Sequence, residues 1–180
     1  MASDWGLLFV RVVVGFFLFG HGTQKLFGWF GGRGLRATIA GMGTNLRLRP
    51  AVVWGMLAGV TEAGGGLLFG LGLLSPLGSL GIIAAMLMAS VLAHWGKLWA
   101  SNRGMEFPLS NLAIAVAVGL IGPGSYSLDA ALGIALPEPL SIEVGVGLVL
   151  IGTALAIVSR TPRPSPAPTH LGDQTAASRP

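Results

Sequence analysis

The sequence predicts an all-α protein, a polytopic transmembrane helix bundle, and three observations lead to this class. Hydrophobic residues make up 52% of the 180 residues and charged residues only 10%, whereas a soluble domain carries about a quarter charged residues. The apolar residues arrive in blocks of about twenty, the length that an α-helix needs to cross the hydrocarbon core of a bilayer. Lysine and arginine fall between alternate blocks, which is typical of multi-pass membrane proteins.

Five blocks are candidates for membrane-spanning helices. The fourth block is short, so it needs its flanks, Phe107 and the Gly-Pro-Gly at 122–124, to reach both interfaces, or it tilts little in a thin bilayer. The first four blocks predict a four-helix core, and the fifth predicts an additional C-terminal helix. The predicted spans are residues 5–28, 51–74, 77–99, 109–122 and 140–158.

The basic residues predict how the chain is oriented. The turn at Ser75-Pro76 and the loop 123–139 contain no lysine or arginine, and the only charges in that loop are Asp129 and Glu138. The other connections and the tail are basic, and lysine and arginine accumulate on the cytoplasmic side. We therefore expect a multi-pass protein of the cell (inner) membrane with its N-terminus outside and its C-terminus in the cytoplasm. The basic residues of these connections and the tail, counting Lys25 and Lys97 at the edges of their spans, are Lys25, Arg33, Arg36, Arg47, Arg49, Lys97, Arg103, Arg160, Arg163 and Arg179.

The two ends of the chain differ in character. Residues 1–6 contain no lysine or arginine ahead of the first apolar block, so the charged region of a cleavable signal peptide is missing and we expect the first block to stay in the mature protein. Residues 161–180 are rich in proline, serine and alanine, which predicts a disordered cytoplasmic tail.

Composition and motifs exclude several classes of function. The net charge is +4, and the basic residues lie mainly in loops between apolar blocks. Orientation in the membrane explains this distribution without nucleic-acid binding. The chain contains no cysteine, which excludes disulfides, thiolate metal sites and thiol redox chemistry by this chain alone. It contains no Walker loop, zinc-ligand spacing or serine triad, so we expect no metal site.

Ionisable residues inside the predicted spans are the candidate functional residues, because a charge in the hydrocarbon core is costly unless it is paired or hydrated. Arg11 and Glu62 differ in depth by roughly 8 Å at the rise of an α-helix, a gap that an arginine side chain can bridge. We expect them to pair, and such a pair suits a structural role as well as a functional one. Glu62 shares a face with small residues that let a neighbouring helix approach closely, so it should face protein. These residues are Gly55, Gly59, Gly66 and Gly70.

Two histidines and a lysine lie toward the predicted cytoplasmic ends of their spans. Lys25 continues the face of Arg11, with His21 at its margin. For His21 a plain interhelical hydrogen bond is favoured over proton or quinone chemistry, which stays open as the alternative. His94 points roughly 160° away from the small-residue face of its helix at 100° per residue, so a cavity and the lipid interface are both open as its surroundings. A bis-histidine haem site at His21 and His94 is disfavoured, because nothing else marks a haem pocket.

Several motifs, in order, carry a resemblance to a known family. They are HGTQKLFGWFGG at 21–32, LAGVTEAGGGLLFGLGLLSPLG at 57–78, the Ala-His pair at 93–94, and MEFPLSNLAIAVAVGLIGPGSYSLD at 105–129. Over about the first 130 residues the chain resembles the DoxX family. The resemblance implies a four-helix membrane domain in residues 1–132, to which residues 133–160 add a transmembrane helix and residues 161–180 a tail.

The resemblance also implies a function and a set of site residues. Members of the DoxX family are associated with redox systems, quinone-linked or concerned with thiol and oxidative stress, and act with protein partners in the membrane. Catalytic residues are not implied. The family's recurring polar groups fall at Arg11, His21, Lys25, Glu62 and His94, the same buried polar residues that the cost of membrane burial selects.

The leading hypothesis is a redox-associated membrane subunit with a pocket for a quinone or a similar amphipathic molecule near Arg11, His21 and Glu62. Two other classes stay open. The polar residues could line a route for a small solute or a proton, although no span is broken by proline and no inverted repeat is visible. The chain could also be a scaffold whose basic first loop and tail dock soluble redox enzymes. The sequence does not identify the electron donor or the electron acceptor. It also leaves open whether the chain is catalytic alone and whether it associates with further copies of itself.

Overall fold

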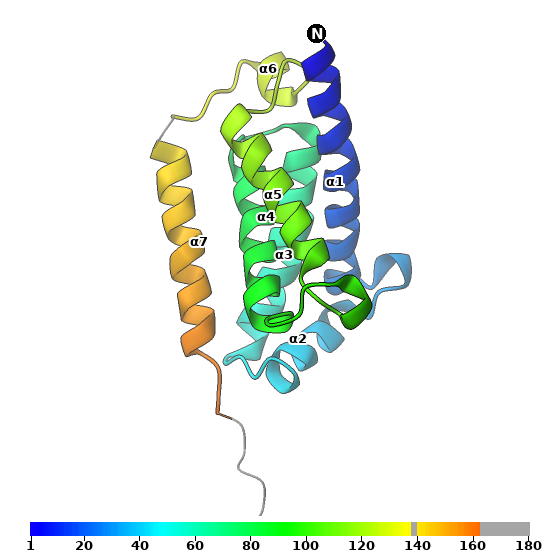
Figure 1. Cartoon of the computed structure of the whole chain (residues 1–180), viewed down its shortest axis with the longest axis vertical. Coiled ribbons are helices and arrows are strands. Elements are labelled where there is room, and N and C mark those ends of the chain that lie inside the picture. Colours follow the sequence, from blue (N-terminus) through cyan, green and yellow to red (C-terminus); the bar gives the residue numbers. More distant parts are fainter. Residues whose placement is uncertain (138–139, 163–180) are drawn as a thin grey trace, which may run out of the picture.

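The computed structural model describes residues 1–137 and 140–162, and in these residues every regular element is a helix, which confirms the predicted all-α class (Figure 1). The predicted tail falls almost wholly outside the described residues. The elements are α1 (Ala2–Leu26), a 3-10 turn η1 (Trp29–Gly31), α2 (Gly34–Thr44), α3 (Ala51–Leu71), α4 (Leu77–Met88), a π-helical turn η2 (Ala89–Ala93), a 3-10 turn η3 (Ala100–Asn102), α5 (Glu106–Ile121), α6 (Leu128–Leu132) and α7 (Leu140–Val158).

Three helices, α1, α3 and α7, are long and apolar enough to cross a membrane. The segment Leu77–Ala93 and helix α5 are apolar but shorter, and the short fourth predicted span indicates this only for α5. The third predicted span ends at Ala93 rather than at Trp99, because the helix widens into the π-helical turn η2 and stops. Gly96, two residues after His94, has a φ of 83°, a left-handed conformation that does not continue a helix.

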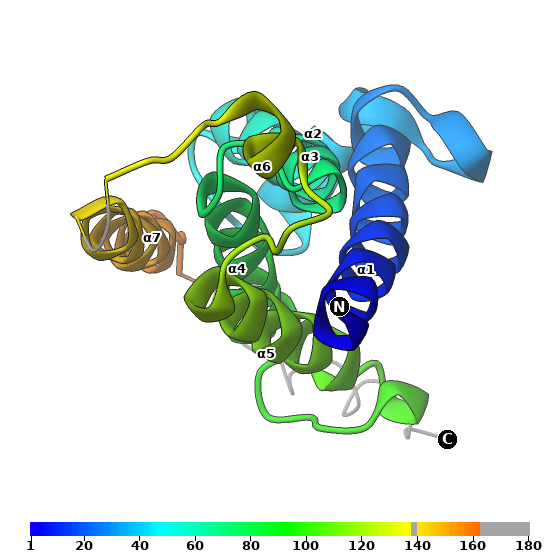
Figure 2. The ribbon, with the colours of Figure 1, turned by 90° about the horizontal axis from the view of Figure 1, so that it is seen from above.

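Helices α1, α3, α4 and α5 form a four-helix bundle in which neighbours along this series pack on one another (Figure 2). Helix α7 packs on α4 from outside, and α2 lies across one end, against α1 and α3. We call this end, which also holds the α4–α5 connection, the α2 end. The opposite end, which holds the start of α1, is the α6 end.

Two helices lie where the sequence analysis expected loops. Helix α2 occupies the basic first connection, and its Ile39 packs directly on the backbone of α3 at Gly55. Helix α6 occupies the loop 123–139, and the hydroxyl of Ser127 caps it by accepting a hydrogen bond from the backbone N–H of Ala130 at 3.1 Å. Both helices cover bundle ends, where the last turns of longer helices leave backbone groups to be satisfied.

Glycines let α1 and α3 approach so closely that their backbones touch. Gly15 lies against Gly66 and Gly70, and Gly22 lies against Ala63. This is the small-residue face predicted for the second span, and the contact is of the kind that holds helices together in lipid. Because the contacts are between backbones, α1 and α3 cannot slide along one another. The contacts therefore determine which residues of the two helices lie at the same height in the bundle.

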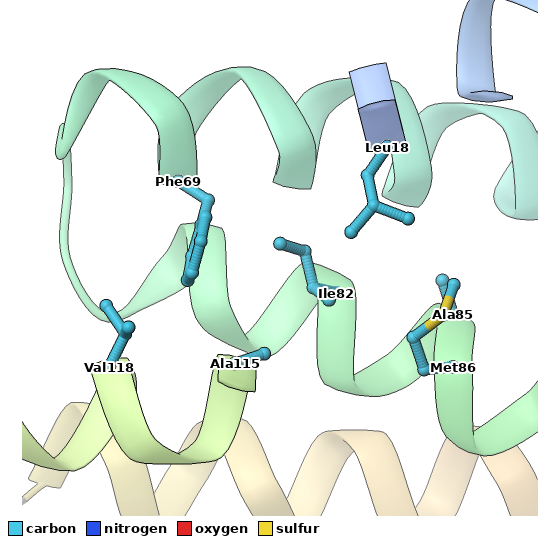
Figure 3. Close-up of a cluster of buried hydrophobic side chains, with 7 residues drawn as sticks. All are labelled: Leu18, Phe69, Ile82, Ala85, Met86, Ala115 and Val118. Carbon is cyan, nitrogen blue, oxygen red and sulfur yellow. The ribbon is translucent and has the colours of Figure 1, made fainter. Parts of the chain in front are cut away.

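The hydrophobic core lies between the four bundle helices (Figure 3). In contrast, large apolar side chains on the outside of the bundle are exposed, among them Phe9 at 69%, Phe16 at 62% and Leu150 at 57%. Such a surface suits acyl chains as the surrounding medium and is rare on proteins in water. The core residues are Leu18, Phe69, Ile82, Ala85, Met86, Ala115 and Val118.

The glycine contact predicts the effects of two matched substitutions in α3. A Cβ atom at Gly66 would lie within 3.0 Å of backbone atoms of α1, whereas at Gly64 it would meet no described atom within 4 Å. Gly66→Ala should therefore lower the free energy of unfolding by about 1–3 kcal/mol. Gly64→Ala should leave it unchanged or raise it slightly through helix propensity. Thermal unfolding in detergent micelles measures both, and equal stability of the two variants would contradict the close contact.

Candidate functional site

Glu62 lies in the middle of α3 on the side that faces α1, and only 5% of its surface is exposed. Lys25, at the α2 end of α1, forms an ion pair with it and donates a hydrogen bond from Nζ to Oε1. The second carboxylate oxygen, Oε2, is buried and has no hydrogen-bond partner among residues 1–137 and 140–162. Because a buried acceptor without a donor is costly, we expect a water or a ligand to donate to this oxygen.

The predicted pair between Arg11 and Glu62 is wrong. The close packing of α1 on α3 places Gly22 level with Ala63 and the carbonyl of Arg11 level with Gly70. Arg11 is therefore about eight residues, or about 12 Å, away from Glu62 along α3. The same register brings a different cation, the lysine at the end of α1, to Glu62.

Arg11 instead holds the α6 end of the bundle together. Its side chain is 1% exposed, and Nη2 donates a hydrogen bond to the carbonyl of Tyr126. Its Nε and Nη1 are buried and have no hydrogen-bond partner among the described residues. Asp129, at the same end, accepts hydrogen bonds on its carboxylate from the backbone N–H groups of Leu74 at 2.8 Å and Ser75 at 2.7 Å. The cavity beside Arg11 measures about 10 Å³, the size of one water molecule. The hydrogen bond to Tyr126 and a cavity too small for a ligand indicate a structural role for Arg11.

His94 directly follows the π-helical turn, which determines the direction of its side chain. The backbone N–H of His94 donates to the carbonyl of Ala89, five residues earlier, at 3.1 Å, so the ring departs from the direction that a regular helix predicts. Its Nδ1 lies 2.6 Å from the carbonyl oxygen of Arg103. Since a carbonyl only accepts, Nδ1 carries a proton, and the neutral ring has its lone pair on Nε2.

His21 lies on α1 one turn before Lys25, and its side chain is exposed. Its ring meets the ring of Phe107 edge to face, with centroids 5.6 Å apart and an interplanar angle of 66°. His21 and Phe107 together form one side of a cavity of about 210 Å³, which Lys25, Glu62 and His94 also line. The structure thus answers the open question about His94, which faces a cavity.

A second cavity, of about 470 Å³, adjoins the first. The two cavities share four lining residues, Lys25, Glu62, Ala89 and His94, so the polar residues stand where the cavities meet. Helices α3, α4 and α7 form most of the walls of the larger cavity. Of the five residues expected at the site, four lie together, and Arg11 lies apart.

The polar groups at this junction suit proton transfer and hydrogen bonding. Within the described part of the chain, no group of three or more histidine, aspartate or glutamate side chains is placed to hold a metal ion. The junction offers a paired carboxylate with one unmet oxygen, an imidazole with a fixed tautomer, and an ammonium group. Such groups bind and orient hydroxyl or carbonyl groups and exchange protons with them.

Comparison with known proteins gives one match. The sequence model of the DoxX family matches residues 6–95, which is half of the chain. The matched region runs from within α1 to just beyond η2 and contains all five of the expected site residues, whereas α5, α6 and α7 lie beyond it. No curated protein and no solved structure matches the chain.

The observed pairing predicts a pattern of energetic coupling. Residues in contact couple by about 0.5–3 kcal/mol, whereas changes at sites more than about 10 Å apart add within about 0.5 kcal/mol. Lys25→Met and Glu62→Gln should therefore couple in a double-mutant cycle, and Arg11→Met should add to Glu62→Gln independently. Unfolding free energies in micelles provide the measurement. A stronger coupling of Glu62 to Arg11 than to Lys25 would show that the register is wrong.

Proposed function

The chain belongs to the DoxX family, and on that premise we propose that it is an integral membrane subunit of a redox system that binds a quinol or a similar amphipathic molecule. The observation that supports this proposal is the position of Lys25, Glu62 and His94 at the junction of two cavities, a smaller one that His21 also lines and a larger one with mainly apolar walls. A small molecule with a polar head and an apolar body fits such a pair of cavities.

The free groups at the junction favour a head that carries hydroxyl groups. Oε2 of Glu62 and Nε2 of neutral His94 both accept hydrogen bonds. A quinol hydroxyl donates to such acceptors, and its proton can pass to either one when the quinol is oxidised. Lys25 keeps the negative charge of Glu62 compensated in the low dielectric of the bundle. His21, exposed at the side of the smaller cavity, then exchanges protons with the surroundings.

Electrons require a partner. The sequence contains no cysteine, and the junction supplies acid–base groups, so the role proposed for this chain is to hold the head and to accept or supply its protons. A redox protein docked on the membrane would exchange the electrons. The α2 end, which carries the basic connections, is the face proposed for such a partner.

The distribution of charge supports an orientation in the cell membrane. Basic side chains gather at the α2 end, whereas Asp4 and Asp129 belong to the α6 end. By the positive-inside rule the α2 end faces the cytoplasm, with the N-terminus outside and the C-terminus inside. The basic residues of the α2 end are Lys25, Arg33, Arg36, Arg47, Arg49, Lys97, Arg103 and Arg160.

Quinol binding tests the proposed site directly. Glu62→Gln replaces the charged carboxylate by an amide whose single oxygen is a weaker acceptor, and His94→Ala removes the imidazole acceptor. Each should weaken binding of a benzoquinol to the purified chain by about tenfold. Ser90→Ala is the matched control. Ser90 lies in the π-helical turn η2, which leads to His94, but its hydroxyl is already used because it donates to the carbonyl of Met86. Partner-dependent quinone reduction in native membranes should follow the same order. Equal affinities in wild type and all three variants would remove the proposal.

Labelling of introduced cysteines tests the orientation, and the cysteine-free chain gives no background. Ser125, near the α6 end, and Ser101, near the α2 end, are both exposed. In intact cells a membrane-impermeant maleimide should label Ser125→Cys and should spare Ser101→Cys until the membrane is permeabilised. The reverse pattern would invert the proposed topology.

A further inference from the structure

The larger cavity is polar at one end only. Its hydroxyl groups are already used, since Thr61 donates to the carbonyl of Leu57 at 2.7 Å and Thr153 donates to that of Val149 at 2.8 Å. The walls away from the junction are formed mainly by aliphatic side chains and methionine. A molecule in this cavity therefore meets hydrocarbon everywhere except at the junction with the smaller cavity.

Helix α7 is held in place as one wall of this cavity. At the α2 end Arg160, just beyond α7, donates from Nε to the carbonyl of Leu46 at 3.2 Å and from Nη2 to that of Leu92 at 3.4 Å. At the other end Gly145 packs directly on Leu80 of α4. Residues 148, 149, 152 and 153 between these two attachments line the cavity. Helix α7 lies beyond the region that the family model matches.

We propose that the cavity between α3, α4 and α7 is the binding site for the apolar chain of the ligand, and that α7 determines the specificity for that chain. The inference rests on the proposed function, which places the head at the junction. The ligand class is a single-chain amphiphile with a neutral, hydroxyl-bearing head. A volume of about 470 Å³ falls within the range of about 300–1,000 Å³ that is usual for small-molecule pockets.

The head chemistry distinguishes this ligand from a bilayer phospholipid. A phosphate group at the junction would bring no donor to the unmet oxygen of Glu62. Because Lys25 already compensates the charge of Glu62, a phosphate would also leave the buried junction with a net negative charge, which is costly in a low dielectric. A neutral hydroxyl group supplies the missing donor. The anionic lipid is therefore the occupant that the site disfavours, and it serves as a competitor in the test.

Two glycines of α7 provide a matched pair of variants. A Cβ atom added at Gly152 or at Gly147 would meet no described atom within 4 Å, so an added side chain begins in open space at both positions. Gly152 lines the larger cavity, and Gly147 is not among its lining residues. Gly152→Leu should therefore take up part of the cavity, while Gly147→Leu makes the same chemical change on the same helix outside it.

The test compares a decyl-substituted benzoquinol with the same benzoquinol carrying a methyl group. Binding is measured on the full chain in nanodiscs, where partition of each probe into the lipid is the same for all variants. Gly152→Leu should weaken binding of the decyl compound by about tenfold through loss of buried methylene groups, and it should leave binding of the methyl compound unchanged. Gly147→Leu should bind both compounds like wild type. Lysophosphatidylglycerol should not displace the decyl compound.

The outcomes separate this inference from the proposed function. If wild type binds both probes in a Glu62-dependent manner but Gly152→Leu still binds the decyl compound normally, the chain-binding cavity is refuted and the head site stands. Displacement by lysophosphatidylglycerol would refute the neutral-head class. If wild type binds neither probe, the proposed function and this inference both fail.

Discussion

The close backbone contact between α1 and α3 is the constraint on which the rest of the structure depends. In lipid, helices gain little from burying apolar surface against one another, so small residues that permit close packing hold them together. Gly15 and Gly22 on α1 meet Gly66, Gly70 and Ala63 on α3. This contact leaves a single register, and in that register Lys25 meets Glu62. A shift of one helical turn would move Lys25 by about 5.4 Å and separate the pair.

The register also divides the buried charges into two groups with different roles. At the α6 end, Arg11 and Asp129 are engaged by backbone groups of the loops they close. Toward the α2 end, Glu62 retains an oxygen without a donor among the described residues, and His94 presents its ring to two cavities. Both groups contain buried polar atoms that no described residue satisfies, Nε and Nη1 of Arg11 and Oε2 of Glu62. The space beside them differs: the cavity at Arg11 measures about 10 Å³, room for one water, whereas those at Glu62 measure about 210 and 470 Å³ and can hold a larger molecule.

The sequence predicted the helical class, and its predicted spans correspond to the apolar helices, because the hydrocarbon core imposes both length and composition. It also predicted His21, Lys25, Glu62 and His94 as candidates, because buried ionisable residues are costly and therefore few. The Arg11–Glu62 pair was wrong because depths counted from span ends ignore the register that only the glycine contact determines. His94 faces the cavities because a π-helical turn precedes it. The prediction assumed a regular α-helix with 100° of rotation per residue, which does not include such a turn. The sequence places Asp129 in a predicted loop and does not show that it is buried. The serine two positions before it is a typical helix cap, a signal that a helix begins there.

The account makes Glu62 the group that meets the ligand, and infrared difference spectroscopy of the full chain in nanodiscs measures this most directly. On addition of a benzoquinol, the account predicts a change in the carboxylate bands that is lost in Glu62→Gln and kept in Arg11→Met. A difference spectrum in which the benzoquinol binds but the carboxylate bands stay unchanged would contradict the central claim.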